Sequence, residues 1–232
     1  MVMEIKVVKK ILDVNDTFAA ENRKWFEANH VFVLNMMSSP GSGKTSILEK
    51  SLSRLGSEVR CGVIVGDICT TNDADRLVSI DTPVVQINTD EFGGDCHLSA
   101  HVIRKAAEQF DLDKIDLLIV ENIGNLVCPA EFDIGEDARA VVLSVTEGED
   151  KPLKYPLMFR VCDVALLNKI DLLPYLIYDR QLVADNIRQI HSDMPVFEVS
   201  AQTGDGLAEW IVWLQSKVYG KKGCHRSSPS ER

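Results

Sequence analysis

One stretch of the sequence has the residue types that bind a phosphate chain: Ser38-Ser39-Pro40-Gly41-Ser42-Gly43-Lys44-Thr45. An apolar run over 31–37 precedes it, and a run typical of a helix follows over 46–52. A strand, a glycine-containing loop and a helix in this order form a P-loop, whose backbone N–H groups and helix N-terminus converge on an anion. The alternative is an ordinary strand-to-helix turn, and the order of the three parts argues against it.

Two side chains of this stretch have separate predicted roles. Lys44 is expected to reach the β- and γ-phosphates, and the Thr45 hydroxyl to take a Mg²⁺ position. Ser38 stands where the strict motif begins with glycine, and its small size still allows the turn. The predicted phosphate-binding residues are Gly41, Ser42, Gly43, Lys44, Thr45 and Ser46.

A second motif, Asn168-Lys169-Ile170-Asp171, directly follows an apolar run over 164–167. In P-loop GTPases this pattern reads guanine. The Asp carboxylate accepts hydrogen bonds from two groups of the base that adenine lacks, and the Asn side chain meets the base edge. Ser200-Ala201-Gln202 resembles the Ser-Ala-Lys loop that packs over guanine, with Gln202 in place of lysine. The predicted base-binding residues are Asn168, Lys169, Asp171, Ser200, Ala201 and Gln202.

Acidic residues at strand ends are candidates for the Mg²⁺ of such a site. Asp67 and Glu121 each follow an apolar run, and Asp73 lies in the polar stretch after the first of them. Carboxylates at the carboxyl ends of parallel strands are typical Mg²⁺ neighbours, although they can also cap loops or helices. Gly124 is expected to donate its N–H to the γ-phosphate. Thr45, Asp67, Asp73 and Glu121 are therefore the predicted magnesium residues, and Lys44, Thr45, Asp67 and Glu121 the predicted catalytic ones.

Cysteine and histidine suggest a second kind of site. Cys96 and His97 are expected to open a helix, where a thiolate has a lowered pKa, and Cys128 follows the Glu121 strand. Two cysteines and a histidine suit Zn²⁺ or Ni²⁺, with a fourth ligand from water, from a second copy of the chain, or from His101. The spacing alone favours buried structural cysteines instead. Disulfides are not expected, because a cytosolic chain keeps its thiols reduced.

The elements that must position these residues alternate along the chain. Strands are predicted near 59–65, 84–87, 116–121, 140–145, 164–167 and 196–199, and helices near 4–29, 46–52, 97–110, 182–190 and 206–218. This alternation predicts an α/β fold of the P-loop NTPase type, with a mostly parallel sheet covered by helices on both faces. The predicted parts are a helical extension over 1–30, a GTPase domain over 31–219, and a polar tail without fixed structure over 220–232.

Composition excludes several other classes of protein. The 232 residues include 25 basic and 35 acidic side chains, a net charge of −10, which is poorly suited to nucleic acid. No apolar run reaches the length of about 20 residues that a membrane helix needs. The N-terminus lacks the apolar core of a secretory signal, so the chain is expected to be cytoplasmic.

The motifs together resemble the HypB family of hydrogenase nickel-incorporation GTPases over about residues 14–218. The specific stretches are Cys96-His97-Leu98-Ser99-Ala100-His101 and Glu121-Asn122-Ile123-Gly124-Asn125-Leu126-Val127-Cys128-Pro129. Further likeness lies in 31–45, 66–68 and 168–172, and Ser38 in place of glycine is itself a family feature. Three departures are the long acidic loop over 90–95, Cys69 where an acidic residue is common, and an N-terminal region without cysteine or a histidine-rich store.

The resemblance implies a P-loop GTPase of the dimerising class that delivers Ni²⁺ to the large subunit of nickel–iron hydrogenase. It also implies a small zinc-containing partner, HypA, and a Ni²⁺ or Zn²⁺ site at a GTP-promoted homodimer interface, built from Cys96, His97 and Cys128. No membrane or nucleic-acid partner is implied. The alternatives are the related urease accessory GTPase, whose metal motif is Cys-Pro-His, a nickel or zinc storage protein, and a P-loop kinase or ATPase without guanine preference.

Overall fold

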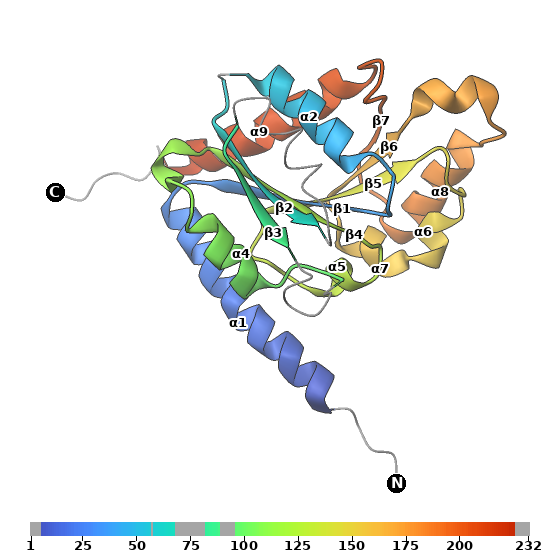
Figure 1. The fold of residues 1–232 in the computed structure, drawn as a ribbon. Coiled ribbons are helices and arrows are strands. Elements are labelled where there is room, and N and C mark those ends of the chain that lie inside the picture. Colours follow the sequence, from blue (N-terminus) through green and yellow to red (C-terminus); the bar gives the residue numbers. More distant parts are fainter. Residues whose placement is uncertain (1–5, 57, 68–81, 89–95, 226–232) are drawn as a thin grey trace, which may run out of the picture.

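The computed structural model describes residues 6–56, 58–67, 82–88 and 96–225. In that part of the chain a seven-stranded parallel sheet has the order β3-β2-β4-β1-β5-β6-β7 (Figure 1). Its strands are β1 (Phe32–Ser38), β2 (Cys61–Asp67), β3 (Val84–Asn88), β4 (Leu117–Gly124), β5 (Ala138–Ser144), β6 (Val164–Asn168) and β7 (Val196–Glu198). The predicted α/β fold with a parallel sheet is confirmed.

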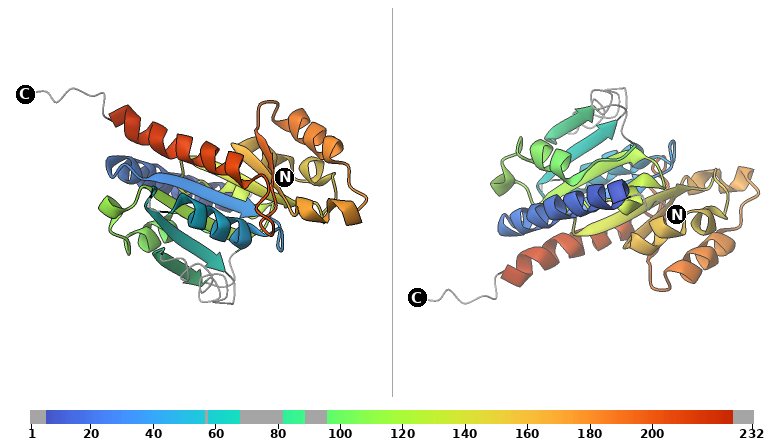
Figure 2. Two further views of the ribbon diagram at one scale, coloured as in Figure 1. Left: turned by 90° about the horizontal axis from the view of Figure 1, so that it is seen from above. Right: turned by 90° about the horizontal axis from the view of Figure 1, so that it is seen from below.

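The helices form two layers, one on each face of the sheet (Figure 2). They are α1 (Lys6–Ala28), α2 (Lys44–Leu55), α4 (Ala100–Ala107), α5 (Cys128–Glu131), α6 (Lys151–Lys154), α7 (Pro156–Val161), α8 (Arg180–Ile190) and α9 (Leu207–His225), with short 3-10 helices η2 (Leu112–Lys114) and η3 (Ile170–Tyr175). α2 and α9 pack on one face, and α1, α4, α7 and α8 pack on the other. No helix in the described ranges is long and apolar enough to cross a membrane.

The central strands are buried on both sides, which explains their continuous apolar runs. All seven residues of β1 are buried, and so are seven of the eight in β4. Leu34 and Ile119 belong to the core under α2 and α9, whereas Val33 and Val120 belong to the core under α1 and α4. Successive side chains of a strand alternate between the two faces, so apolar residues are needed at every position.

The N-terminal helix α1 is present as predicted, but asparagines as well as apolar residues form its buried stripe. Val14 is 51% exposed and Phe18 40% exposed, although both lie at helical spacing with the buried Phe26. Asn22, in contrast, is 1% exposed, and its Nδ2 donates to the main-chain oxygens of Ala100 at 2.7 Å and Ile134 at 3.1 Å. Polar contacts with α4 and with the loop after α5 therefore fix α1 on the sheet.

The C-terminal region differs from the prediction. α9 continues to His225, so the expectation that 220–225 lack fixed structure is wrong; residues 226–232 lie outside the described ranges. The reason is a pair of ion pairs at the end of the helix. Lys221 Nζ lies 2.6 Å from an Asp137 carboxylate oxygen, and Lys222 Nζ lies 2.7 Å from Asp116. Both aspartates stand just before strands, so basic residues that resembled a solvated tail dock the helix on the sheet.

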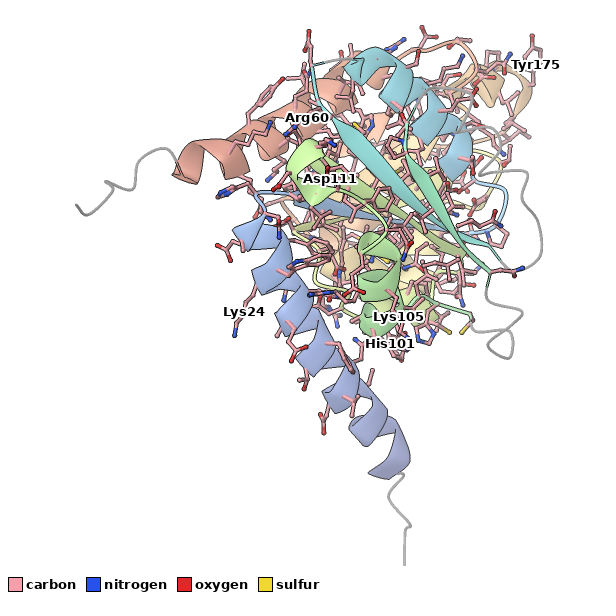
Figure 3. All side chains as sticks on the ribbon, turned by 60° about the vertical axis from the view of Figure 1, so that its left-hand side comes forward. Lys24, Arg60, His101, Lys105, Asp111 and Tyr175 are labelled. Carbon is pink, nitrogen blue, oxygen red and sulfur yellow. The ribbon has the colours of Figure 1, made fainter. Side chains whose placement is uncertain are left out.

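Asp116 is the most heavily paired carboxylate at this edge. It is 4% exposed and accepts hydrogen bonds from Arg60, whose Nη2 lies 2.5 Å from Oδ1, as well as the ion pair from Lys222. Arg60 itself lies at the surface beside η2 (Figure 3), where it also bonds the Asp113 carbonyl. Burial by itself would raise the pKa of Asp116, but the bonds from Arg60 and Lys222 hold that pKa well below the ordinary aspartate value.

We predict that Asp116→Asn lowers the free energy of unfolding by about 1–3 kcal/mol at pH 7, because two charge-assisted hydrogen bonds are weakened. Because the pKa of Asp116 is lower in the folded than in the unfolded chain, its ionised carboxylate stabilises the fold fully at pH values above the unfolded pKa of about 3.9. This stabilisation is lost as the pH falls from there through the folded-state pKa. The difference from wild type should therefore shrink below about pH 4. Urea unfolding at several pH values measures it.

The matched control is Asp111→Asn. Asp111 pairs with Lys114 at 2.7 Å on an exposed turn, so its loss should move the unfolding midpoint far less. A difference for Asp116→Asn that is absent at pH 7, or that stays constant down to pH 2.5, would contradict the assigned role of the ion pairs.

Candidate nucleotide and metal site

The predicted phosphate loop joins the carboxyl end of β1 to the amino end of α2. Gly41 and Gly43 have φ of +74° and +95°, a region that only glycine enters without strain. α2 begins at Lys44, so its first N–H groups face the loop. Lys44 Nζ donates to Ser38 Oγ at 2.7 Å, and Ser38 Oγ donates to the Ser39 carbonyl at 2.7 Å. Serine in place of the first glycine thus gives the lysine side chain a hydrogen-bond acceptor.

Ser42, in the middle of the loop, has a buried hydroxyl. Ser42 is 1% exposed, and within the described residues its Oγ has no hydrogen-bond partner. Buried hydroxyls nearly always have one, so an exception calls for a ligand or an ion. A phosphate oxygen bound in the loop would supply the missing acceptor, so this site fits the predicted ligand.

The predicted magnesium residues lie at the carboxyl ends of two neighbouring strands. Thr45 Oγ1 donates to Glu121 Oε1 at 2.6 Å, and both side chains are buried. The predicted strand ends at Glu121, whereas β4 continues past it to Gly124. Asp67 is the last residue of β2, the strand next to β4. A hydroxyl and carboxylates are the oxygen donors that Mg²⁺ prefers, so these residues fit that ion; Asp73 lies outside the described residues.

A cavity of about 410 Å³ adjoins the loop and brings the predicted base-binding residues together. It is lined by Gly43, Ser46, Glu49, Lys50, Asn168, Lys169, Asp171, Leu172, Ala201 and Gln202. Asp171 Oδ1 accepts a hydrogen bond from Ser200 Oγ at 2.5 Å, which fixes the carboxylate that the motif assigns to guanine. Three stretches far apart in the sequence therefore form one pocket.

Asn168 joins the parts of this pocket to one another. Its Nδ2 donates to the Ser42 carbonyl at 2.9 Å, and its Oδ1 accepts from Ala201 N at 3.2 Å. Lys169 adds a second link from its Nζ to the Gly41 carbonyl at 2.7 Å. Sequence reasoning placed the Asn168 side chain on the base edge, whereas both of its polar atoms bond the protein in this structure. Asn168 is thus a brace between the phosphate loop and the loop over the base.

Glu147 is a site residue that sequence reasoning missed. It follows β5, and its Oε1 accepts a hydrogen bond from Ser39 Oγ in the phosphate loop at 2.6 Å. Lys151 Nζ lies 3.5 Å from its other carboxylate oxygen. Its position in the sequence could have indicated this role, because it lies three residues after an apolar strand and the other carboxylates of the site were predicted from their positions near strand ends.

The predicted metal residues lie on two segments, which meet where His97 contacts Phe132. Cys96 is exposed, and its Sγ lies 3.8 Å from Nδ1 of His97. The His97 ring stacks on Phe132, at the end of α5, with 3.7 Å between ring centroids. Cys128 is the first residue of that helix. The prediction that Cys96 and His97 open a helix is wrong, because α4 begins only at Ala100.

The remaining histidine and cysteine candidates are not drawn into this group. His101 lies on the outer side of α4 (Figure 3), where its Nδ1 is 3.0 Å from Ser99 Oγ and its ring faces Phe18. Burial raises the pKa of the Cys61 thiol to about 12 and that of Cys162 further still, as expected of core cysteines. Across the described ranges, no three His, Cys, Asp or Glu side chains form a group that could hold a metal ion within one chain.

We predict that Gly43→Ala lowers nucleotide affinity at least about tenfold, or about 1.4 kcal/mol. A methyl group at Gly43 would lie 2.4 Å from Asn168 Nδ2, on a backbone with φ +95°, and would displace the brace. Titration with a fluorescent guanine nucleotide measures the loss. Gly220→Ala is the control, because nothing lies within 4 Å of its new methyl group. Equal affinity in Gly43→Ala and wild type would contradict the position of the site.

Comparisons with known proteins agree with this geometry. A family model described as the CobW/HypB/UreG nucleotide-binding domain matches residues 32–198. The chain is 49% identical over 211 residues to the hydrogenase maturation factor HypB of Azotobacter chroococcum mcd 1, covering 91% of this chain and 68% of that protein. It is 47% identical over 213 residues to the Escherichia coli (strain K12) HypB, covering 92% and 72%.

A solved structure shows the same fold. HypB from Helicobacter pylori, crystallised in complex with nickel, matches with a TM-score of 0.83 at 35% identity and covers 94% of this chain and 99% of that one. The family model spans well over half of the chain, and the relatives are nearly half identical over nine tenths of it. The chain therefore belongs to the HypB family of hydrogenase maturation factors.

Proposed function

We propose that the chain is a GTP-hydrolysing nickel metallochaperone that helps to insert Ni²⁺ into nickel–iron hydrogenase. The observation that carries the proposal is the Asn168 brace, which joins a phosphate loop to a pocket lined by Asp171. A loop with only a structural role has no need of an adjoining cavity with a fixed carboxylate. The phosphate loop and the adjoining pocket together fit a guanine nucleotide, since Asp171 can accept hydrogen bonds from guanine groups that adenine lacks.

Hydrolysis would transfer the γ-phosphoryl group to water. The loop N–H groups and Lys44 bind the phosphates and stabilise the charge that develops on them, since Lys44 already lies at the loop through Ser38. Thr45 and Glu121, with Asp67, would hold Mg²⁺, which when bound neutralises phosphate charge. Gly124 would donate its N–H to the γ-phosphate. None of the motifs recognised in the sequence supplies a glutamine or arginine for the reacting phosphate, so we expect slow turnover.

Nickel is the proposed cargo, held by Cys96, His97 and Cys128. A thiolate pair and an imidazole suit Ni²⁺ and Zn²⁺, and the solved Helicobacter pylori relative is a nickel complex. These are three ligands, and a second copy of the chain can supply the fourth ligand that a tetrahedral site takes. We propose that GTP joins the copies in a homodimer and that hydrolysis resets the metal site.

The partners follow from the family. They are the small zinc-containing nickel chaperone HypA, with which the chain would work, and the large subunit of nickel–iron hydrogenase, which would receive the nickel. The net charge of −10 fits a protein that handles cations in the cytoplasm and not one that binds nucleic acid.

We predict that the wild-type chain hydrolyses GTP slowly and that Lys44→Ala lowers kcat about 100-fold or more, since a donor to the developing charge is lost. Phosphate release with purified protein measures it. Lys154→Ala is the control, because Lys154 pairs with Asp150 on an exposed helix away from the loop. Wild-type protein without GTPase activity would contradict the proposal and favour a metal storage protein.

We predict that Cys96→Ala and Cys128→Ala each weaken nickel binding at least about tenfold in the presence of a slow GTP analogue. Competition with a metal indicator measures the affinity. Cys61→Ala is the control, since its thiol bonds the Val59 carbonyl and stays protonated. Nickel affinity that falls as far in Cys61→Ala, or in neither test variant, would contradict the assigned ligands.

A further inference from the structure

The carboxyl end of β4 lies between the proposed phosphate site and the proposed nickel ligands. Its last residues, Glu121, Asn122, Ile123 and Gly124, are followed by Asn125. Glu121 faces α2, where it accepts from Thr45. Asn122 is the next residue and lies on the opposite face, among the groups covered by α1 and α4. One short segment therefore contacts both sites from the two faces of the sheet.

This segment contains an irregularity in the sheet. β1 pairs with β4 as Met36 with Glu121, but further along as Ser38 with Gly124, so β4 holds one extra residue. Asn122 Oδ1 accepts from Ile123 N at 2.9 Å and so satisfies a main-chain N–H at this point. Bulges of this kind re-aim side chains and occur next to functional sites.

Asn122 also contacts the segment that carries His97. Its Oδ1 accepts from Leu98 N at 3.4 Å, while its Nδ2 donates to Asn35 Oδ1 at 3.2 Å. Asn35 in turn donates to Glu136 Oε1 at 3.2 Å. Asn122 is 1% exposed and Asn35 fully buried, so water cannot replace these bonds if β4 moves.

Leu98 directly follows His97 and is held by two strands. It is 1% exposed, and a methyl group on Gly66 would lie 2.7 Å from its Cδ1. Its side chain therefore packs on the β2 backbone one residue before Asp67, while its N–H bonds Asn122 of β4. Movement at the end of either strand is passed to the residue next to His97.

Asn125, the residue after β4, contacts the two segments that carry the proposed cysteine ligands. Its Nδ2 donates to the Cys96 carbonyl at 3.4 Å, and its Oδ1 accepts from Val127 N at 2.8 Å, in the turn before Cys128. The preceding residue, Gly124, packs on the phosphate loop, since a methyl group there would lie 3.1 Å from Pro40 Cα.

We propose that Asn122 and Asn125 are positioning residues that transmit the nucleotide state to the nickel ligands; this inference rests on the proposed function. Their bonds to Leu98 and Cys96 are both 3.4 Å, beyond the usual 2.7–3.2 Å. A shift of a few tenths of an ångström at the end of β4 therefore decides whether they hold. A γ-phosphate at Gly124, or a changed contact at Glu121, produces such a shift.

The test compares nickel affinity with GDP and with a slow GTP analogue in wild type, Asn125→Ala and Asn122→Ala. We expect the two nickel affinities to differ at least about fivefold in wild type. In each variant they should differ less than about twofold, while the affinity of the protein for GDP itself stays unchanged. A metal-free readout is the rate at which Cys96 is alkylated, followed by mass spectrometry. Its dependence on the nucleotide should disappear in both variants.

Asn29→Ala is the matched control, because this half-buried asparagine follows α1 and its side chain donates to the Trp25 carbonyl of that helix at 2.7 Å, away from both sites. Asn125 is half-buried as well, so its variant keeps the test valid even if the buried Asn122→Ala unfolds. Wild-type nucleotide dependence that survives in Asn125→Ala would overturn the inference. Wild-type protein that hydrolyses GTP and binds nickel with no such dependence also overturns it, together with the proposed reset of the metal site, yet leaves the proposed GTPase activity and nickel binding standing. Only loss of those two activities in wild type overturns the proposed function as a whole.

Discussion

The parallel pairing of β1 with β4 is the constraint on which the site depends. β1 ends in the phosphate loop, and β4 ends in Glu121, Gly124 and the turn that leads to Cys128. Because the carboxyl ends of parallel strands meet at one edge of a sheet, this pairing alone places the loop beside the segment that leads to the metal residues. The apolar residues on both faces of the two strands hold that edge in position.

A second group of contacts turns this edge into a binding site. Asn168 at the end of β6 bonds the phosphate loop and the loop after β7, and Lys169 and Glu147 each bond the phosphate loop as well. These are side-chain bonds to the main chain or to a hydroxyl of the loop, so they shape it without occupying the pocket. The phosphate loop is therefore held in its conformation by residues at the ends of β5 and β6, which is what preorganised binding of a charged ligand requires.

Local motifs were predictable from the sequence, and long-range polar contacts were not. The P-loop and Asn168-Lys169-Ile170-Asp171 could be recognised because their chemistry depends on residues next to one another in the chain. The burial of Asn22 on α1 could not, because its partners are the main-chain oxygens of Ala100 and Ile134, which lie far away in the sequence. The end of α9 was missed for a similar reason: Lys222 reads as a solvated residue until Asp116 is known to lie beside it. The start of α4 at Ala100 was missed because the Leu98 N–H bonds Asn122 of β4 and Ser99 stands in extended backbone before the helix.

We propose that the nickel ligands complete their site between two copies of the chain and that the end of β4 couples these ligands to the nucleotide. A crystal structure with nickel and a slow GTP analogue tests this most directly. We expect one nickel ion between two copies, bound by Cys96, His97 and Cys128, with the analogue's γ-phosphate next to Gly124. Nickel bound wholly within one chain, or a dimer that forms on another face with the analogue bound, would contradict it.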